Sequence, residues 1–396
     1  MPKKKLVFLL CYCLLTLVLT GCWDRVEIED RGFAVGSAID LVEKKADGSY
    51  ELMLTSQFVV PSGLGAPMQG RGGEQKAYLN ISATGESLFQ ANREMATLTS
   101  QVPFYQHLKV LIVSEDVVKE PHLFGSIMDL FIRDHEMRRG IRIVIAEGEA
   151  RKILDIKPDN EKIPALYLDS LMENNYKNAG SLKPVHIGEL QELLLSERGY
   201  SIPEVHFVAD KFIQYKGAAV FNGVTNEMVD SLMGEEAKGL AFLTETSTDG
   251  SIKVNVNGEM VTVELKSVDR GIHVTPKDKT DIDAKIDIHV NGNVAERFGK
   301  ASVRMDSYIK KVEKAVEDKI KKMTTQTKDK LQKELKVDVI GVGDNLYQKH
   351  YSFWNTVKDD WDKGENYYSQ SKININVTVK VQMVGSSDKV KTTGDD

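Results

Sequence analysis

The sequence lacks an N-terminal apolar segment long enough to cross a bilayer as a helix. The stretch from Leu6 to Thr20 has about 15 residues, whereas a spanning helix needs roughly 20. Lysines at positions 3–5 precede this stretch, and small residues follow it. A basic start, a short apolar core and a small-residue cleavage site are typical of a secretory signal. We therefore predict that residues 1–21 are a lipoprotein signal peptide, removed on export.

Cysteine is scarce, with three in the whole chain. Cys11 and Cys13 lie inside the predicted signal peptide, so the mature protein would keep Cys22 alone, which excludes an intramolecular disulfide. Cys22 follows Leu-Thr-Gly, a pattern that lipoprotein processing recognises, and its thiol can form a thioether to diacylglycerol. We predict lipidation at Cys22, with fatty acids such as palmitate in the anchor. An ordinary secretory signal with a chance cysteine, or an uncleaved anchor, is the alternative.

Positive charge is in deficit. The chain has a net charge of −6, and loss of the three leader lysines would leave a mature chain of about −9. An anionic bilayer or a nucleic acid repels such a body. We therefore expect no nucleic-acid partner, and we expect the lipid to hold the protein, since two acyl chains anchor stably where one does not. The predicted location is the extracytoplasmic face of a membrane.

Recognisable catalytic and metal-binding motifs are missing. His135-Glu136 begins like a zinc-protease motif, but Arg139 stands where the second histidine is required. The eight histidines are scattered, with no pair at i, i+4. Gly341 and Gly343 lack the third glycine of a dinucleotide fingerprint, and no Gly-x-Ser-x-Gly elbow occurs. We expect a binding or assembly protein that is not an enzyme and that uses no metal or other cofactor beyond the lipid.

Hydrophobic periodicity predicts an N-terminal α+β domain over residues 22–205. Strands are expected at 33–39, 50–60, 78–82, 108–114 and 141–145, and helices at 84–98, 123–131, 147–154, 164–175 and 187–196. Thr84 is the expected N-cap of the first helix. The strand at 108–114 is almost wholly apolar, as at a sheet centre, and it forms a βαβ unit with the next helix and strand.

A C-terminal α+β region is predicted over residues 206–390, with two subdomains expected at about 206–250 and 251–390. Alternating strands come first, then an amphipathic helix from about 301 to 336, then a last strand that alternates without a break from Ile373 to Met383. This order predicts one long helix packed against an antiparallel sheet. The fold class is therefore α+β, with several domains and with mixed or antiparallel sheets packed against helices.

The residues around Cys22 resemble the start of a known family. Residues 21–40 read GCWDRVEIEDRGFAVGSAID, and further matching segments follow in order at 83–91, 107–115, 131–138 and 143–154. Together they are similar to the Ger(x)C family, the lipoprotein C subunits of bacterial spore germinant receptors. The resemblance covers essentially the whole mature chain. One departure is Arg25-Val26, which stands where a second polar residue is expected.

This resemblance implies a lipid-anchored, non-enzymatic protein in a sporulating bacterium. It would lie on the outer face of the spore inner membrane with two embedded partners, a multi-spanning A subunit and a permease-like B subunit. The complex would respond to small nutrients and trigger germination. A lipid-anchored solute-binding protein of a transporter is the competing hypothesis, disfavoured by the strand-rich second half. An extracytoplasmic hydrolase is disfavoured by the missing catalytic motifs.

The stem beside the lipid is the predicted partner-binding segment. Trp23, Asp24 and Glu27 lie within about five residues of Cys22, an extended reach of roughly 18 Å. Tryptophan suits the headgroup zone, but Asp24 and Glu27 gain nothing from an anionic surface. We expect these two acids to pair with lysines or arginines in the outer loops of an embedded partner. The alternative is that they solvate the stem or cap the first domain.

Overall fold

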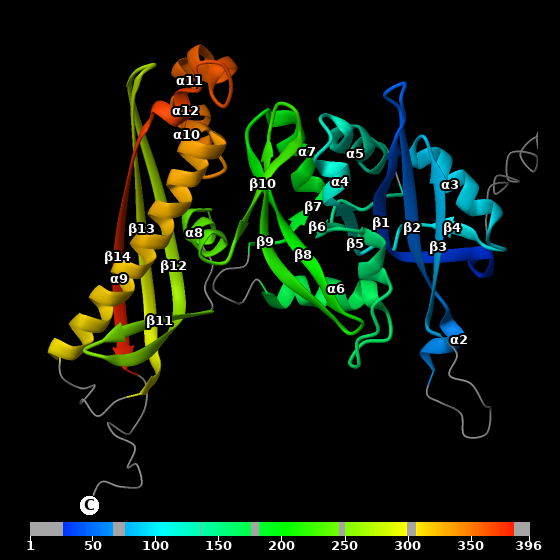
Figure 1. Ribbon diagram of the computed structural model, residues 1–396, viewed down its shortest axis with the longest axis horizontal. Helices are drawn as coiled ribbons and strands as arrows, with labels where there is room; N and C mark the ends of the chain where they lie inside the picture. Colours follow the sequence, from blue (N-terminus) through cyan, green and yellow to red (C-terminus); the bar gives the residue numbers. More distant parts are fainter. Residues whose placement is uncertain are drawn as a thin grey trace, which may run out of the picture.

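The computed structural model describes residues 27–65, 76–134, 136–175, 182–244, 250–298 and 306–383. These residues form two β-sheets, each packed with helices, which lie side by side along the long axis of the molecule (Figure 1). Within these ranges, no helix is long and apolar enough to cross a membrane. The predicted α+β class, with more than one sheet packed against helices, is confirmed.

The first sheet contains ten of the described strands. Eight follow the order β10-β9-β8-β6-β5-β1-β2-β3, while β4 pairs with β1 and β7 pairs with β6. Strand β1 is antiparallel to β2 but parallel to β4 and β5, so the sheet is mixed. The strands are β1 (Arg31–Lys44), β2 (Tyr50–Val59), β3 (Tyr78–Gly85), β4 (Val102–Phe104), β5 (Val110–Ser114), β6 (Arg142–Glu147), β7 (Val185–His186), β8 (Tyr200–Ala209), β9 (Phe212–Asn222) and β10 (Glu227–Met233).

Helices cover both faces of this sheet and create two cores. On one face, α3, α5 and α7 bury apolar side chains against Leu111 and Ile143. On the other face, α6 and a short 3-10 helix pack against Ile112 and Val144. Because side chains alternate along a strand, the apolar strands β5 and β6 serve both cores. The helices are α2 (Pro61–Leu64), α3 (Leu88–Thr97), α4 (Glu115–Val118), α5 (Leu123–Arg133), α6 (Pro164–Asn175) and α7 (Ile187–Ser196), and the 3-10 helix is Ala150–Leu154.

The predicted βαβ unit is confirmed, but the predicted cap of the first helix is wrong. Strands β5 and β6 are parallel, and α5 lies between them in the chain. Thr84 is not a cap, because β3 continues through it and pairs it with Met53 of β2. Ser87 caps α3 instead, since its Oγ accepts the Gln90 N–H at 3.2 Å.

Strands β8, β9 and β10 extend the first sheet to Met233, because β8 runs parallel to β6 and the other two pair antiparallel beyond it. The division predicted after residue 205 therefore falls inside β8, and residues 206–233 hydrogen-bond within the first sheet rather than in a separate unit. An Asn-Gly pair such as Asn222-Gly223 favours a hairpin turn, but the alternation of the flanking strands does not reveal which sheet the hairpin joins.

The second sheet has the order β11-β12-β13-β14, with the long helix α9 lying along it (Figure 1). Val312, Val316 and Ile320 of α9 are buried, as their spacing predicts. Strand β14 runs parallel to β13, whereas an antiparallel sheet was expected. The helical connection returns the chain to the end at which β13 begins, and this permits the parallel pairing. The elements are β11 (Gly250–Val256), β12 (Glu259–Asp278), β13 (Asp281–Phe298), α9 (Asp306–Asp329), a π-helical turn (Lys330–Leu335), α10 (Val342–Lys349), α11 (Tyr351–Val357), a 3-10 turn (Lys358–Asp360), α12 (Tyr367–Gln370) and β14 (Lys372–Met383).

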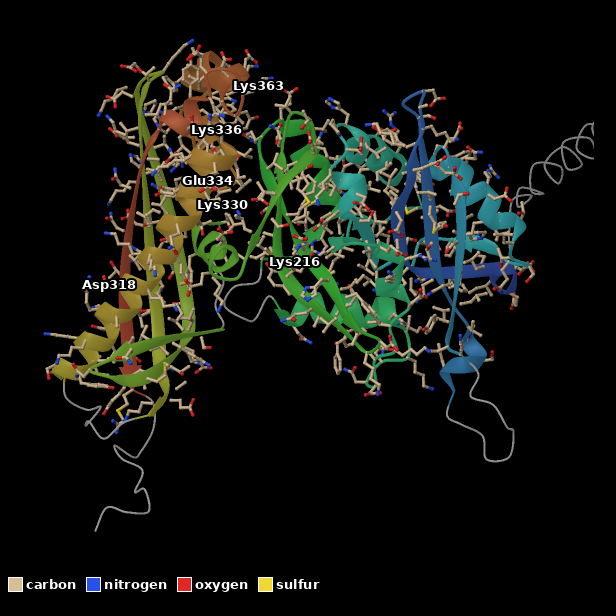
Figure 2. The ribbon with its side chains drawn as sticks, viewed as in Figure 1. Lys216, Asp318, Lys330, Glu334, Lys336 and Lys363 are labelled. Carbon is tan, nitrogen blue, oxygen red and sulfur yellow. The ribbon has the colours of Figure 1, made fainter. Side chains whose placement is uncertain are left out.

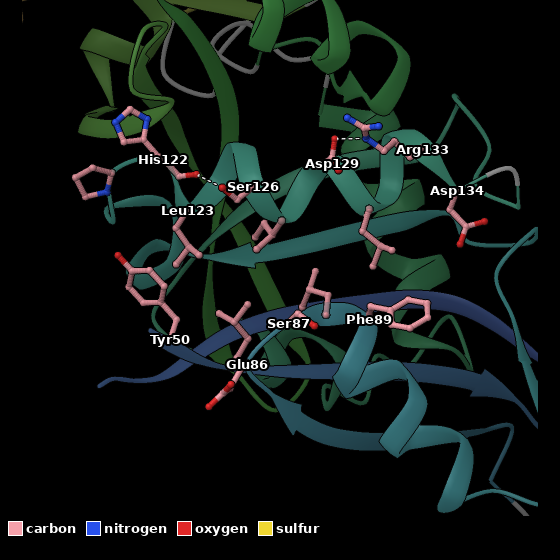
Figure 3. Close-up of a pocket in the computed structure, with 15 residues that line it drawn as sticks. Tyr50, Glu86, Ser87, Phe89, His122, Leu123, Ser126, Asp129, Arg133 and Asp134 are labelled. Carbon is pink, nitrogen blue, oxygen red and sulfur yellow. Dashed lines mark hydrogen bonds and ion pairs between the residues drawn. The ribbon is translucent and has the colours of Figure 1, made fainter. Parts of the chain in front are cut away.

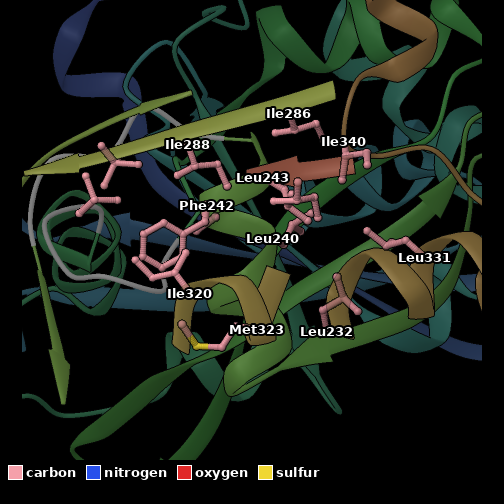
Figure 4. Packing of buried hydrophobic residues seen from close by; sticks show 14 of the residues in the cluster. Leu232, Leu240, Phe242, Leu243, Ile286, Ile288, Ile320, Met323, Leu331 and Ile340 are labelled. Carbon is pink, nitrogen blue, oxygen red and sulfur yellow. The ribbon is translucent and has the colours of Figure 1, made fainter. Parts of the chain in front are cut away.

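Helix α8 (Glu235–Thr244) lies between the two sheets and joins their cores. The buried cluster that contains its Leu240 also includes Leu232 of β10, Ile286 of β13 and Met323 of α9 (Figure 4). Lys330 adds polar contacts from the π-helical turn, with Nζ 2.9 Å from Asp230 and 3.0 Å from Glu236 (Figure 2). One hydrophobic cluster therefore continues across the junction.

Gly239 tests how tightly this junction is packed. A glycine inside a helix usually costs about 1 kcal/mol relative to alanine, but a Cβ here would lie 2.1 Å from Thr327 Oγ1 and 2.7 Å from the Met323 carbonyl oxygen of α9. We predict that Gly239→Ala lowers the free energy of unfolding by about 1–3 kcal/mol, measured by urea denaturation. Gly125→Ala in α5 is the matched control, because its Cβ would meet nothing closer than 3.4 Å. Equal stability of the two variants would contradict the packing described.

Candidate functional site

The predicted site residues lie at or just before the start of the described chain. Cys22, Trp23 and Asp24 fall outside the described residues, whereas Glu27 is the first residue within them. Glu27 is exposed and precedes a 3-10 helix over Ile28–Asp30, whose Asp30 N–H donates to the Glu27 carbonyl at 3.1 Å. The structure thus places Glu27 at the entry of β1, on the solvent side.

An aromatic hollow of about 340 Å³ opens beside Glu27. Its lining residues come from the stem and from the segment around β4: Glu27, Ile28, Arg31, Phe33, Phe104, Gln106 and His107. The rings of Phe33 and Phe104 meet edge to face at 5.7 Å, and the Arg31 guanidinium lies 4.2 Å from the centre of the Phe104 ring. This hollow can receive one side chain of a partner, in the way that interfaces seat their anchor residues.

A larger groove of about 740 Å³ runs between α3 and α5 (Figure 3). Leu88 of α3, Leu52 of β2 and Leu123, Ile127 and Leu130 of α5 supply apolar lining. Phe89 stands at its rim and is 57% exposed, which is unusual for so large an apolar ring. The shape suits an apolar ligand or an amphipathic helix.

The charges at the rim of this groove have partners within the chain. Asp129 Oδ1 lies 2.6 Å from Arg133 Nε on the same helix, and Glu86 Oε1 lies 2.7 Å from Lys45 Nζ. The rim therefore offers little net charge to select a ligand, and the groove is defined mainly by its apolar walls. Its two sides come from segments more than thirty positions apart in the sequence. The hydrophobic periodicity of each segment therefore could not predict the groove.

A buried ion cluster lies where α4 meets β8, β9 and β10. Lys216 Nζ lies 2.8 Å from Glu204 Oε1 and 3.2 Å from Glu115 Oε1, and the Ser231 hydroxyl donates to Glu204 Oε2 at 2.6 Å (Figure 2). Burial raises the pKa of Glu204 to about 7, and its hydrogen bond with Glu115 adds to the rise. Burial also acts to raise the pKa of Glu115, but hydrogen bonds with Glu204, Lys119 and Lys216 lower it to about 2. The two carboxyl groups thus share one proton near neutral pH.

A second buried carboxyl pair, Asp338 and Asp362, lies at the junction of the two sheets. Asp338 accepts the Gly343 N–H at 2.6 Å and the Trp361 Nε1–H at 3.0 Å. Asp362 accepts the N–H groups of Asp338 at 3.1 Å and of Gly199 at 3.2 Å. Burial raises the pKa of Asp362 to about 8. Their donors are backbone and indole N–H groups, so these carboxyls tie together the segments around Gly199, Asp338 and Trp361 at the junction.

Metal-binding geometry does not occur in the part of the chain that the structure describes, where no three His, Cys, Asp or Glu side chains are grouped to hold an ion. The ionisable groups instead form ion pairs and backbone contacts, such as the Asp40 carboxylate, which accepts the Ala150 N–H at 2.5 Å. The aromatic hollow and the α3–α5 groove are the candidate binding sites of the described residues.

Two family descriptions match this sequence over most of its length. Residues 24–207 match the family "Spore germination protein N-terminal domain". Residues 216–385 match "Spore germination B3/ GerAC like, C-terminal". The change from one description to the other lies in the hairpin of β8 and β9, inside the first sheet.

Relatives match the chain almost from end to end. Spore germination protein YndF of Bacillus subtilis (strain 168) is 32% identical over 404 residues, covering 97% of this chain and 98% of that protein. Spore germination protein A3 of the same strain is 28% identical over 386 residues, covering 96% and 98%. The crystal structure of the GerBC protein superposes with a TM-score of 0.59 at 20% sequence identity, covering 89% of this chain and 99% of that one.

The fold is therefore that of a spore germination protein, with a large N-terminal sheet followed by a smaller sheet packed on one long helix. The chain belongs to the Ger(x)C family, and the resemblance read from residues 21–40 and the later motifs is confirmed.

Glu204 provides a pH-dependent test of the ion cluster. Its folded pKa of about 7 lies above the ordinary value of 4.5, so between these values the folded chain keeps a proton that the unfolded chain has released. The stability that Glu204 contributes should therefore fall as pH rises from about 5 to 7. We predict that Glu204→Gln, which imitates the protonated acid, reduces this decline by about 1–3 kcal/mol, measured as urea midpoints from pH 5 to 8. Parallel curves for the variant and the parent chain would contradict the raised pKa.

Proposed function

We propose that this protein is a lipid-anchored, non-enzymatic subunit of a nutrient germinant receptor, required for assembly or response of the complex that triggers spore germination. The observation that carries this proposal is the match of nearly the whole chain to spore germination proteins. The surface hollows described above, lined by apolar and aromatic side chains, support a role in binding partners rather than in catalysis.

The proposed anchor is a diacylglyceryl group on Cys22, at the extracytoplasmic face of the spore inner membrane. Three features of the sequence support it: the short apolar leader, the Leu-Thr-Gly-Cys pattern and an acidic body that an anionic bilayer does not attract. Two acyl chains supply the stable attachment that charge does not.

The proposed partners are a multi-spanning A subunit and a permease-like B subunit. In this arrangement Trp23 lies among the lipid headgroups, and Asp24 and Glu27 pair with basic outer loops of an embedded subunit. Exposure of Glu27 at the start of the described chain supports this role. The alternative of a solute-binding protein has less support, because the two sheets differ in size and in helix content and so do not form two similar lobes around a cleft.

Substitution of Cys22 tests the anchor. We predict that Cys22→Ala yields unprocessed or released protein, because alanine has no thiol to accept the diacylglyceryl group. Metabolic labelling with a fatty acid and membrane fractionation measure the effect, and Thr20→Ser, which keeps a small residue before the cleavage site, is the control. If the alanine variant were still labelled with fatty acid and still bound to the membrane, the anchor would lie elsewhere.

Removing charge from the stem tests partner binding. We predict that Asp24→Asn with Glu27→Gln keeps lipidation and protein level but lowers co-purification with the permease-like subunit about tenfold, the effect of losing about 1.4 kcal/mol. Asp269→Asn with Glu334→Gln, two exposed acids of the C-terminal part, is the matched control. Unchanged co-purification and an unchanged nutrient response would exclude the stem from the interface.

A further inference from the structure

We propose that the edge of the first sheet beside the stem docks on an extracytoplasmic loop of a membrane-embedded subunit, and that this loop carries both apolar and basic side chains. The stem-side edge consists of Ile28, Leu98 and Val102 as apolar contacts, with Glu29 and Asp30 as acidic neighbours. This inference rests on the proposed function, because it assumes the lipid on Cys22 and an embedded partner.

Residues far apart in the sequence form this edge. Arg31 of β1 pairs with Val102 of β4 in parallel register, so the short strand β4 lies beside the end of the stem. The Gln101 side chain also donates to the Glu29 carbonyl at 2.9 Å and ties the 3-10 helix of the stem to the segment before β4. Leu98, the residue that ends α3, lies three positions before Gln101.

The apolar side chains of the edge are turned to solvent. Ile28 is 65% exposed, Leu98 is 57% exposed and Val102 is 55% exposed. Single exposed aliphatic residues are common on protein surfaces, but several at one edge indicate a contact surface. The aromatic hollow beside Glu27 is continuous with this edge through Ile28 and can seat one side chain of the same partner.

The length of the stem fixes where this edge can lie. Glu27 lies five positions after Cys22, and an extended chain of that length reaches roughly 18 Å. With the lipid of Cys22 in the bilayer, the stem-side edge is held at the membrane surface. Its contacts there are either the lipid headgroups or the outer loops of embedded proteins.

Charge decides between these two surfaces. Glu27, Glu29 and Asp30 are all exposed at this edge, while the guanidinium of Arg31 lies over the Phe104 ring. An anionic bilayer repels such an edge. A protein loop with lysine or arginine beside apolar side chains matches both its charge and its aliphatic contacts. The geometry therefore points to a basic, partly apolar loop of an embedded subunit.

Three full-length variants test the surface in spores that contain the receptor. The apolar variant combines Ile28→Ser, Leu98→Ser and Val102→Thr, and the charge variant combines Glu29→Gln and Asp30→Asn. The control combines Leu195→Ser, Val208→Thr and Met233→Ser, which are 77%, 51% and 51% exposed in the parent chain and lie away from the stem. We expect the apolar variant to recover at least about tenfold less embedded subunit. The charge variant should recover less than the parent at low salt and should depend less on salt, because salt screens the attraction that only the parent has. The control should match the parent.

Crosslinking identifies what covers the edge. Val102→Cys introduces a single free thiol if Cys22 is acylated and the leader is removed, and a benzophenone maleimide attached there should crosslink to an embedded subunit, whereas the same probe at Leu195→Cys should not. Crosslinks to lipid alone, or equal recovery by the apolar variant and the control, would overturn this inference while leaving the proposed function intact. If the parent chain itself recovers no embedded subunit, both the proposed function and this inference fail.

Discussion

The pairing of β1 with β2, β4 and β5 is the constraint on which the rest of the structure depends. This strand carries the chain from the stem into the centre of the first sheet. Gly36 lets α6 approach closely, because a Cβ there would lie 2.4 Å from the Cβ of Ala165. On the opposite face of β1, the hydroxyls of Ser37 and Ser56 are 3.0 Å apart and buried. The position of β1 therefore sets both cores of the first sheet, the stem-side edge and the floor of the α3–α5 groove.

Elements with a strong local pattern could be predicted from the sequence. The apolar run of β5, the βαβ unit and the spacing of Val312, Val316 and Ile320 in α9 all reflect burial on a defined face. Pairing between distant segments could not be predicted in this way. Thr84 is in a strand because β2 pairs with it, and β14 is parallel because of the path that the chain takes after α9. The local sequence of neither segment indicates the strand with which it pairs.

The candidate sites also differ in whether a local sequence pattern could predict them. The pattern around Cys22 is a contiguous motif, so sequence alone sufficed to predict a lipidation site there. The stem-side edge and the groove instead require the fold, because Arg31, which follows the stem, and Val102 become neighbours only when β1 and β4 pair. Exposed aliphatic residues such as Leu98 also follow no periodic pattern that distinguishes a contact surface from ordinary solvent exposure.

The parallel pairing of β13 with β14 makes the second sheet depend on a strand that is synthesised late. The two strands are separated in the sequence by α9 and several short helices, so the second sheet closes only when the last strand has been made. Until then β13 presents an open edge, which favours aggregation. A prematurely terminated chain keeps that edge permanently. Such a chain also lacks the side chains of Ile375, Val379 and Val381, which β14 contributes to the core of the second sheet.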